Sequence, residues 1–173
     1  MNFTESTIKG LFEIDLERIE DNRGFFARSF CANEFKEMSL CDTFVQSNVS
    51  FNKEAGTLRG MHYQTSPFDE VKLVSCKQGS IFDVAVDLRE GSPTYLHWYG
   101  CELNETNCKS LYIPSGCAHG YQTLKPNSSV SYMVSNFYSP SHERGIRFDD
   151  PLVNIIWPLP ISGLSNKDRD REA

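Results

Sequence analysis

The sequence has 173 residues and a net charge of −6, with 39% hydrophobic and 12% aromatic residues. This composition excludes a disordered chain, and with no block rich in Lys or Arg it argues against a nucleic-acid-binding protein. No apolar run reaches membrane-spanning length, and residues 1–5 lack the features of a signal peptide. We therefore expect a soluble cytoplasmic protein, formed by one domain over residues 1–173 with a charged tail from about residue 165.

Alternating apolar and polar residues predict strands along most of the chain. In chain order, the predicted strands cover residues 12–16, 43–52, 58–64, 71–76, 81–88, 94–103, 110–113, 118–123 and 130–137. Turn residues stand at 22–24, 114–116, 125–128 and 139–142, and one short helix is predicted over 33–38 with Asn33 as its cap. Many short strands with almost no helix predict an all-β sandwich or barrel.

The stretch GTLRGMHYQ, residues 56–64, sets a cation and an imidazole inside a predicted strand. Arg59 and His62 lie in this strand, Lys72 in the next one, and His119 near the start of a later one. A lone histidine in a strand is most often exposed or satisfied by a neighbour. Four polar groups from three strands are costly to bury without partners, so a bound anionic ligand explains the cluster more simply.

Other polar residues support a barrel with a polar mouth. Gln46 and Asn48 share one face of their strand. Tyr132 and Tyr138 fit packing positions, and sequence alone does not select them. Asp83 is unusual because it lies within an apolar strand, whereas Asp168 fits a solvated tail or a segment folded back over the mouth.

The sequence does not favour a metal site. The six cysteines form no CxxC pair and no Cys/His zinc pattern, so we expect free thiols. Of the four histidines, only His62 and His119 are plausible paired ligands, short of the usual three or four. We therefore expect neither a metal nor a cofactor.

Several motifs occur in one order across residues 8–168, and together they are specific. They are RGFF, FVQSN, GTLRGMHYQ, KLVSCKQGSIFDVAVDLREGSPT, IPSGCAHGYQTL, SYMVSNFY, DDP with WPLP, and LSNKD. The chain closely resembles the dTDP-4-dehydrorhamnose 3,5-epimerase family. This resemblance implies a cupin-like jelly-roll barrel with short peripheral helices.

The resemblance also implies a metal-free reaction on a 4-keto-6-deoxyhexose carried by a nucleoside diphosphate. A base removes a proton from C3 or C5, giving an enolate, and an acid returns a proton from the other face. By resemblance His62 is the base, Tyr132 the acid, Lys72 holds the enolate oxygen with help from His119, and Asp168 orients His62. The ligand-contacting positions that match are Arg23, Gln46, Asn48, Arg59, Glu143 and Lys167, and we add Tyr138.

These residue types suit the chemistry. A histidine near its usual pKa is a competent base at neutral pH, and a lysine supplies fixed positive charge where negative charge develops. Arg59 and Arg23 are expected to bind the diphosphate, and Gly60 to keep space between Arg59 and His62. Asp83 remains an alternative carboxylate for His62.

The family is dimeric, and we expect a homodimer in which strand 12–16 pairs across subunits, because its regular alternation leaves an edge to protect.

The chain departs from the family pattern at Arg28, where Glu is usual, and at Glu70, where Gln is usual. Arg offers only donors, so at a base-reading position it would favour cytosine or guanine over thymine. The alternatives are a single-centre epimerase, a keto-isomerase, or a silent cupin that binds a sugar nucleotide.

Overall fold

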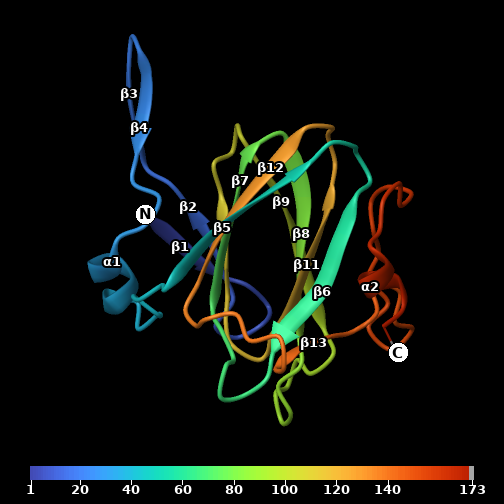
Figure 1. The fold of residues 1–173 in the computed structure, drawn as a ribbon. Coiled ribbons are helices and arrows are strands. Elements are labelled where there is room, and N and C mark those ends of the chain that lie inside the picture. Colours follow the sequence, from blue (N-terminus) through green and yellow to red (C-terminus); the bar gives the residue numbers. More distant parts are fainter. Residues whose placement is uncertain (172–173) are drawn as a thin grey trace.

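A computed structural model describes residues 1–171 of the chain. Two antiparallel sheets face each other, as Figure 1 shows. Among the described residues, the first sheet contains, in spatial order, β1 (Asn2–Glu5), β2 (Phe12–Asp15), β10 (Ser110–Ile113), β7 (Lys72–Gln78), β12 (Ser128–Val134) and β5 (Gln46–Asn52). The second contains β13 (Glu143–Gly145), β6 (Leu58–Gln64), β11 (Cys117–Thr123), β8 (Ser80–Asp87) and β9 (Trp98–Asn104). A hairpin of β3 (Arg18–Asp21) and β4 (Gly24–Ala27) and the short helices α1 (Ala32–Glu37) and α2 (Asn166–Arg169) complete the fold.

This arrangement confirms the expected all-β jelly-roll barrel with short peripheral helices. Each strand predicted from alternation overlaps an observed strand, and boundaries differ by a few residues. Neither helix within residues 1–171 is long and apolar enough to cross a membrane.

Strand β8 shows why its sequence is almost continuously apolar. Ile81 and Ala85 pack into the interior between the sheets. Val84 and Val86 point to the other face, where Val153 and neighbouring apolar residues of the 153–157 segment cover them. Both faces are therefore buried, and Asp83 shares the inward face with Ile81 and Ala85.

Strand β5 has the opposite polarity. Its polar residues Gln46, Asn48 and Ser50 are partly buried, whereas Val49 and Phe51 on the other face are 73% and 51% exposed. Asn48 pairs with Tyr132 of β12, so both side chains lie on the inward face. This end of the barrel interior is therefore polar, in agreement with the polar mouth expected from the sequence.

The helix cap predicted from the sequence is wrong. The N-cap is Cys31, with extended backbone at φ −146° and ψ 114°, and Asn33 lies inside the first turn. The carbonyl of Cys31 accepts the Phe35 N–H at 3.1 Å, and no side chain caps the helix. Phe35 is fully buried among aromatic rings, so its packing rather than a polar cap determines where α1 begins.

The structure also differs from the expectation that strand 12–16 pairs across subunits. Strand β2 pairs with β1 on one side and with β10 on the other, both in its own chain. The edge of this sheet is β1.

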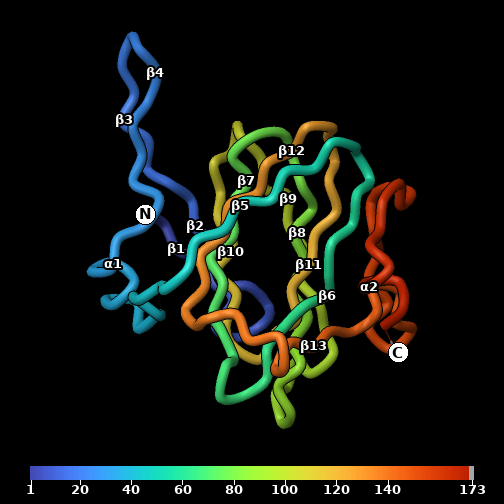
Figure 2. The backbone as a smooth tube through the Cα atoms, in the orientation of Figure 1, coloured from blue at the N-terminus to red at the C-terminus, as the bar shows by residue number. Residues whose placement is uncertain are grey.

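For the β3–β4 hairpin, the sequence predicted the turn but neither of the two strands. We call residues 18–27 the arm, because the hairpin projects away from the barrel (Figure 2). Ile19, Phe25 and Phe26 are 69%, 50% and 62% exposed on it. An isolated apolar hairpin of this kind is not stabilised by its own core.

Candidate active site

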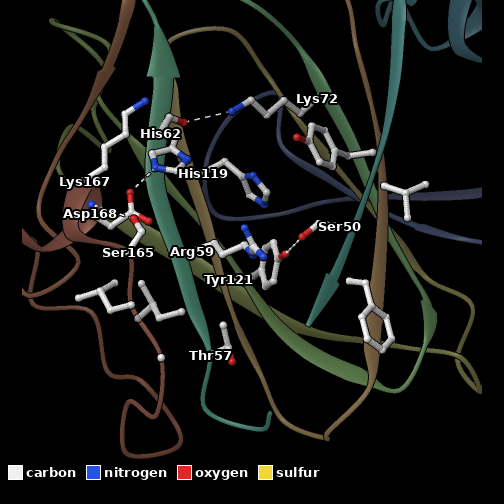
Figure 3. Close-up of a pocket in the computed structure, with 16 residues that line it drawn as sticks. Ser50, Thr57, Arg59, His62, Lys72, His119, Tyr121, Ser165, Lys167 and Asp168 are labelled. Carbon is white, nitrogen blue, oxygen red and sulfur yellow. Dashed lines mark hydrogen bonds and ion pairs between the residues drawn. The ribbon is translucent and has the colours of Figure 1, made fainter. Parts of the chain in front are cut away.

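A cavity opens between the two sheets, and the segment 163–168 closes one side of it (Figure 3). Its volume is about 670 Å³, and its walls come from β5, β6, β7, β11 and β12. A second cavity of about 470 Å³ shares His62, Lys72, Tyr132 and Lys167 with the first. We call the two cavities the large lobe and the small lobe, and these four residues mark their junction.

Most of the residues predicted for the site line one of the lobes. Arg59, His119 and Asp168 line the large lobe, and Gln46, Asn48, Tyr138 and Glu143 line the small lobe. Strand pairing explains the convergence, because His62 lies opposite His119, and directly paired residues of antiparallel strands face the same side.

His62 and Asp168 form a close pair. The Nε2–H of His62 donates to Oδ1 of Asp168 at 2.5 Å, and the Asp168 side chain is only 5% exposed. The Ser165 hydroxyl caps α2 by accepting the Asp168 N–H at 3.1 Å, which fixes the carboxylate. Burial acts to raise the pKa of Asp168, but the hydrogen bond and charge of His62 outweigh it and lower that pKa. A neutral His62 that donates from Nε2 keeps Nδ1 as a proton acceptor.

His119 has a carboxylate partner of its own. Its Nε2–H donates to Oδ1 of the fully buried Asp83 at 2.8 Å. Asp83 therefore serves His119, and Asp168 serves His62, which decides between the two alternatives left by the sequence. The second oxygen of Asp83 is buried without a hydrogen-bond partner among the described residues.

Lys72 lies at the junction with a mostly buried side chain. Its Nζ donates to the carbonyl of His62 at 3.1 Å and lies 3.2 Å from Oε1 of Glu70.

Tyr132 faces the same junction from β12. Burial raises the pKa of the Tyr132 phenol, the charge of Glu70 raises it further, and the charge of Arg59 opposes them. Tyr132 is therefore a protonated acid at neutral pH.

Arg59 is held at the wall of the large lobe. Its Nε donates to Oδ1 of Asn52 at 2.8 Å, which leaves the terminal guanidinium nitrogens for another acceptor. Asn52 also donates to the hydroxyl of Tyr121 at 3.2 Å, and Ser50 is 2.8 Å from the same hydroxyl. This arrangement presents a forked cation that suits a phosphate group.

Gly60 has a different role from the one predicted. Its φ is +124°, and a Cβ there would lie 2.5 Å from Cα of Gly120 and 2.8 Å from the carbonyl oxygen of His119. The expectation that Gly60 separates Arg59 from His62 is therefore wrong, because glycine is required by the close approach of β11.

An ionic cluster holds the C-terminal segment against the barrel. Glu143 accepts from Lys167 at 2.5 Å, from Tyr138 at 2.7 Å and from Arg171 at 3.0 Å. Burial acts to raise the pKa of Glu143, but the hydrogen bonds from Lys167 and Tyr138, with the charges of Lys167 and His62, lower it to about 2. Arg171 also lies 3.8 Å from Asp168. The cluster thus secures the segment that carries the partner of His62.

Two predicted ligand contacts lie outside both lobes. Arg23 is at the tip of the arm, 85% exposed and paired with Asp21. Arg28 follows the arm, is exposed, and contacts the Cys31 thiol, whose pKa is lowered mainly by the backbone of Glu34. Within one chain, neither arginine reaches the cavity, and the position of Arg28 gives no support to a preference against thymine.

No group of three or more His, Cys, Asp and Glu side chains within residues 1–171 has the geometry of a metal site. Each cavity histidine instead binds a carboxylate. All six cysteines are free, and burial raises the pKa of the Cys76 thiol to about 11.

Sequence reasoning missed the roles of two groups, Glu70 and Arg171, and left the histidine partner of a third, Asp83, undecided. Glu70 was noted only as a departure from a family pattern, and nothing in its polar surroundings indicates burial. Asp83 could be found, since a carboxylate in the apolar run 81–88 requires a partner. Arg171 lies in a charged tail that has no distinguishing pattern.

Comparison with known proteins gives consistent results. A family model described as dTDP-4-dehydrorhamnose 3,5-epimerase matches residues 5–173. A protein of that name from Sinorhizobium fredii is 41% identical over 97% of this chain and 87% of its own length. The crystal structure of the Bacillus anthracis enzyme with TDP and pyrophosphate bound has a TM-score of 0.95 at 38% identity, covering 99% of this chain and 98% of that one. A Legionella pneumophila enzyme in complex with dTDP-4-keto-L-rhamnose has a TM-score of 0.91 at 40% identity, covering 97% and 89%.

Proposed function

The chain belongs to the dTDP-4-dehydrorhamnose 3,5-epimerase family, and from that premise we propose that it inverts both C3 and C5 of a thymidine-diphosphate 4-keto-6-deoxyhexose. It is an epimerase acting on a nucleoside-diphosphate 4-keto-6-deoxyhexose. The observation that carries the proposed mechanism is the junction of the lobes. There, a histidine on one sheet, paired with a carboxylate from α2, faces a phenol on the other sheet, with Lys72 beside them.

His62 is the base of this mechanism. The keto group at C4 acidifies the hydrogens on C3 and C5, and Nδ1 of His62 accepts one of them. Asp168, held ionised by its hydrogen bond, stabilises the imidazolium that forms. The Lys72 ammonium and His119 stabilise the oxygen that becomes negative in the enolate.

Tyr132 is the acid. It extends from β12 in the first sheet, whereas His62 extends from β6 in the second sheet, so the two groups approach a bound sugar ring from opposite faces. Proton removal on one face and proton return on the other inverts a carbon centre. Burial keeps the pKa of the phenol raised, so Tyr132 still carries its proton when the enolate forms.

The diphosphate binds in the large lobe at Arg59, and Gln46, Asn48, Tyr138, Glu143 and Lys167 shape the small lobe around the sugar. Thymine is the proposed base because the similar enzymes are named for dTDP sugars. The reaction uses no metal, since both cavity histidines are committed to carboxylates. The proposed location is the cytoplasm, which cell fractionation tests.

The protein is a homodimer in which the arm of one copy covers the cavity of the other. The arm exposes Ile19, Phe25 and Phe26, and the outer face of the edge strand β5, which borders the large lobe, exposes Val49 and Phe51. Such apolar surfaces favour a second copy as the mutual cover. This contact brings Arg23 and Arg28 to a cavity that neither reaches in its own chain. A monomeric mass at micromolar concentration with full activity would contradict this arrangement.

The test is incubation with a thymidine-diphosphate 4-keto-6-deoxyhexose in deuterated water. We expect deuterium at both C3 and C5 of an inverted product, seen by mass spectrometry and proton NMR. Deuterium at one centre alone would indicate a single-centre epimerase, and movement of the keto group a keto-isomerase. Binding with no exchange would indicate a silent cupin.

A further inference from the structure

Glu70 is a buried charge inside the cavity with no role in the mechanism above. It lines the small lobe immediately before β7. Its Oε1 lies 3.2 Å from Nζ of Lys72, and the two side chains are only 10% and 9% exposed. A buried ion pair costs desolvation energy, so its presence at the reacting junction calls for an explanation beyond stability.

The carboxylate of Glu70 is held rigidly. Nε2 of Gln64 donates to Oε2 of Glu70 and to the carbonyl of Phe68 at 2.8 Å. The Oε1 of Gln64 accepts the Ser139 N–H at 2.6 Å, and its side chain is almost fully buried. Gln64 thereby ties the loop that carries Glu70 to the loop after β12, and Glu70 in turn anchors the end of Lys72.

Glu70 also acts on Tyr132 through its charge, and it raises the pKa of the phenol in addition to the larger effect of burial. The groups around Tyr132 must be considered together. The charged and titratable side chains lining the two lobes with it are Arg59, His62 and Tyr63 from β6, Lys72 from β7, His119 and Tyr121 from β11, Tyr138 from the loop after β12, Glu143 from β13, Lys167 and Asp168 from α2, and Glu70. Of the three carboxylates, Asp168 is paired with His62 and Glu143 with Lys167 and Arg171.

We propose that Glu70 is a positioning residue that fixes the Lys72 ammonium at the junction and keeps Tyr132 protonated into the alkaline range. This role rests on the proposed function, in which Lys72 binds the enolate oxygen and Tyr132 returns the proton. An ammonium held on two sides does not have to be ordered when negative charge develops, which is the condition for strong electrostatic stabilisation. A negative charge beside the phenol disfavours tyrosinate and so preserves the acid.

The direct test is the titration of Tyr132 by the ultraviolet absorbance of tyrosinate. The chain has seven tyrosines, so each titration is taken as the difference from the corresponding protein that also carries Tyr132→Phe. We expect Tyr132 to titrate at a lower pH in Glu70→Gln than in the unmodified protein. Glu102→Gln is the matched control, because Glu102 is an exposed but hydrogen-bonded carboxylate outside both lobes, and it should leave the titration unchanged.

The kinetic test uses the same variants. In Glu70→Gln, the alkaline limb of the pH profile of kcat for inversion should shift to lower pH together with the titration of Tyr132. The KM for the sugar nucleotide should change less than about twofold. Glu70→Met, which also removes the acceptor for Lys72, should lower kcat by a further tenfold or so.

Coincident Tyr132 titration curves for the unmodified protein and Glu70→Gln would overturn the proposal. Loss of folding in both Glu70 variants would also overturn it, because Glu70 would then have a structural role. The titration requires no substrate. The absence of deuterium exchange by the unmodified protein would refute the proposed function and not the effect of Glu70 on Tyr132.

Discussion

In the proposed mechanism, replacing Asp168 by asparagine removes the charge that supports His62 when it takes a proton. Asp168 is nearly buried and accepts from His62 at 2.5 Å, so the lost interaction is a charge-assisted hydrogen bond in a protected site. Such bonds contribute about 1.5–3 kcal/mol, which corresponds to about a 10- to 100-fold loss in the rate of proton abstraction. Asparagine can also donate to Nε2 and so favour the tautomer with the proton on Nδ1, which adds to the loss.

The loss in the rate of proton abstraction caused by Asp168→Asn should be the same at every pH in the neutral range. The hydrogen bond from His62 lowers the pKa of Asp168 although burial acts to raise it, so the carboxylate stays ionised well below neutral pH. The assay is the rate of deuterium incorporation at C3 and C5 between pH 6 and 9. Asp149→Asn is the matched control, because Asp149 forms only an exposed pair with Arg147. Full exchange by Asp168→Asn, or an equal loss in Asp149→Asn, would refute the assignment of Asp168 as the partner of the base.

Three further predictions follow from the site. Tyr132→Phe should keep deuterium exchange at one face while inversion falls by about 10²-fold or more, because the enolate still forms but lacks its acid; equal loss of both would count against a separate acid. Glu143→Gln should lower the free energy of unfolding at pH 7 by about 3 kcal/mol, because the pKa of Glu143 is near 2 in the folded protein, and this stabilisation disappears as the pH falls from about 4.5 to 2. Denaturant unfolding at pH 7 and at pH 2 measures the difference between the variant and the unmodified protein. A loss of stability that persists at pH 2 would contradict the electrostatic cause. Calorimetric titration should show dTDP binding more tightly than CDP or GDP in both the unmodified protein and Arg28→Glu, whereas an order that favours CDP or GDP and weakens in the variant would give Arg28 a base-reading role.

The parts of the fold that could be predicted are those in which one strand face is buried. Strand β8 was predicted because both of its faces are covered, which gives a nearly continuous apolar run, and β6 agrees with its predicted bounds at both ends. The arm and β1 were missed for the opposite reason. Their residues are mostly exposed in one chain, so no inward face constrains the pattern.

The site was only partly accessible from sequence. Arg59 and His62 stand out because they are polar groups inside a strand, but Asp168 came from a resemblance, since its partner lies 106 residues away. The pairing of His119 with Asp83 depends on the register of β11 against its neighbours, which local pattern does not specify. Glu70 was visible as an unusual residue, yet its contact with Lys72 depends on the loop before β7 and on Gln64.

The most direct test of the central claim is deuterium exchange by His62→Ala, measured together with its binding of dTDP. The variant removes the proposed base but leaves Arg59 and the rest of the large lobe in place. We predict that exchange at both C3 and C5 falls by about 10²–10⁴-fold, while the calorimetric Kd for dTDP changes by less than about threefold. Near-normal exchange at either carbon in a folded His62→Ala protein would show that His62 is not the base there, and would contradict the account.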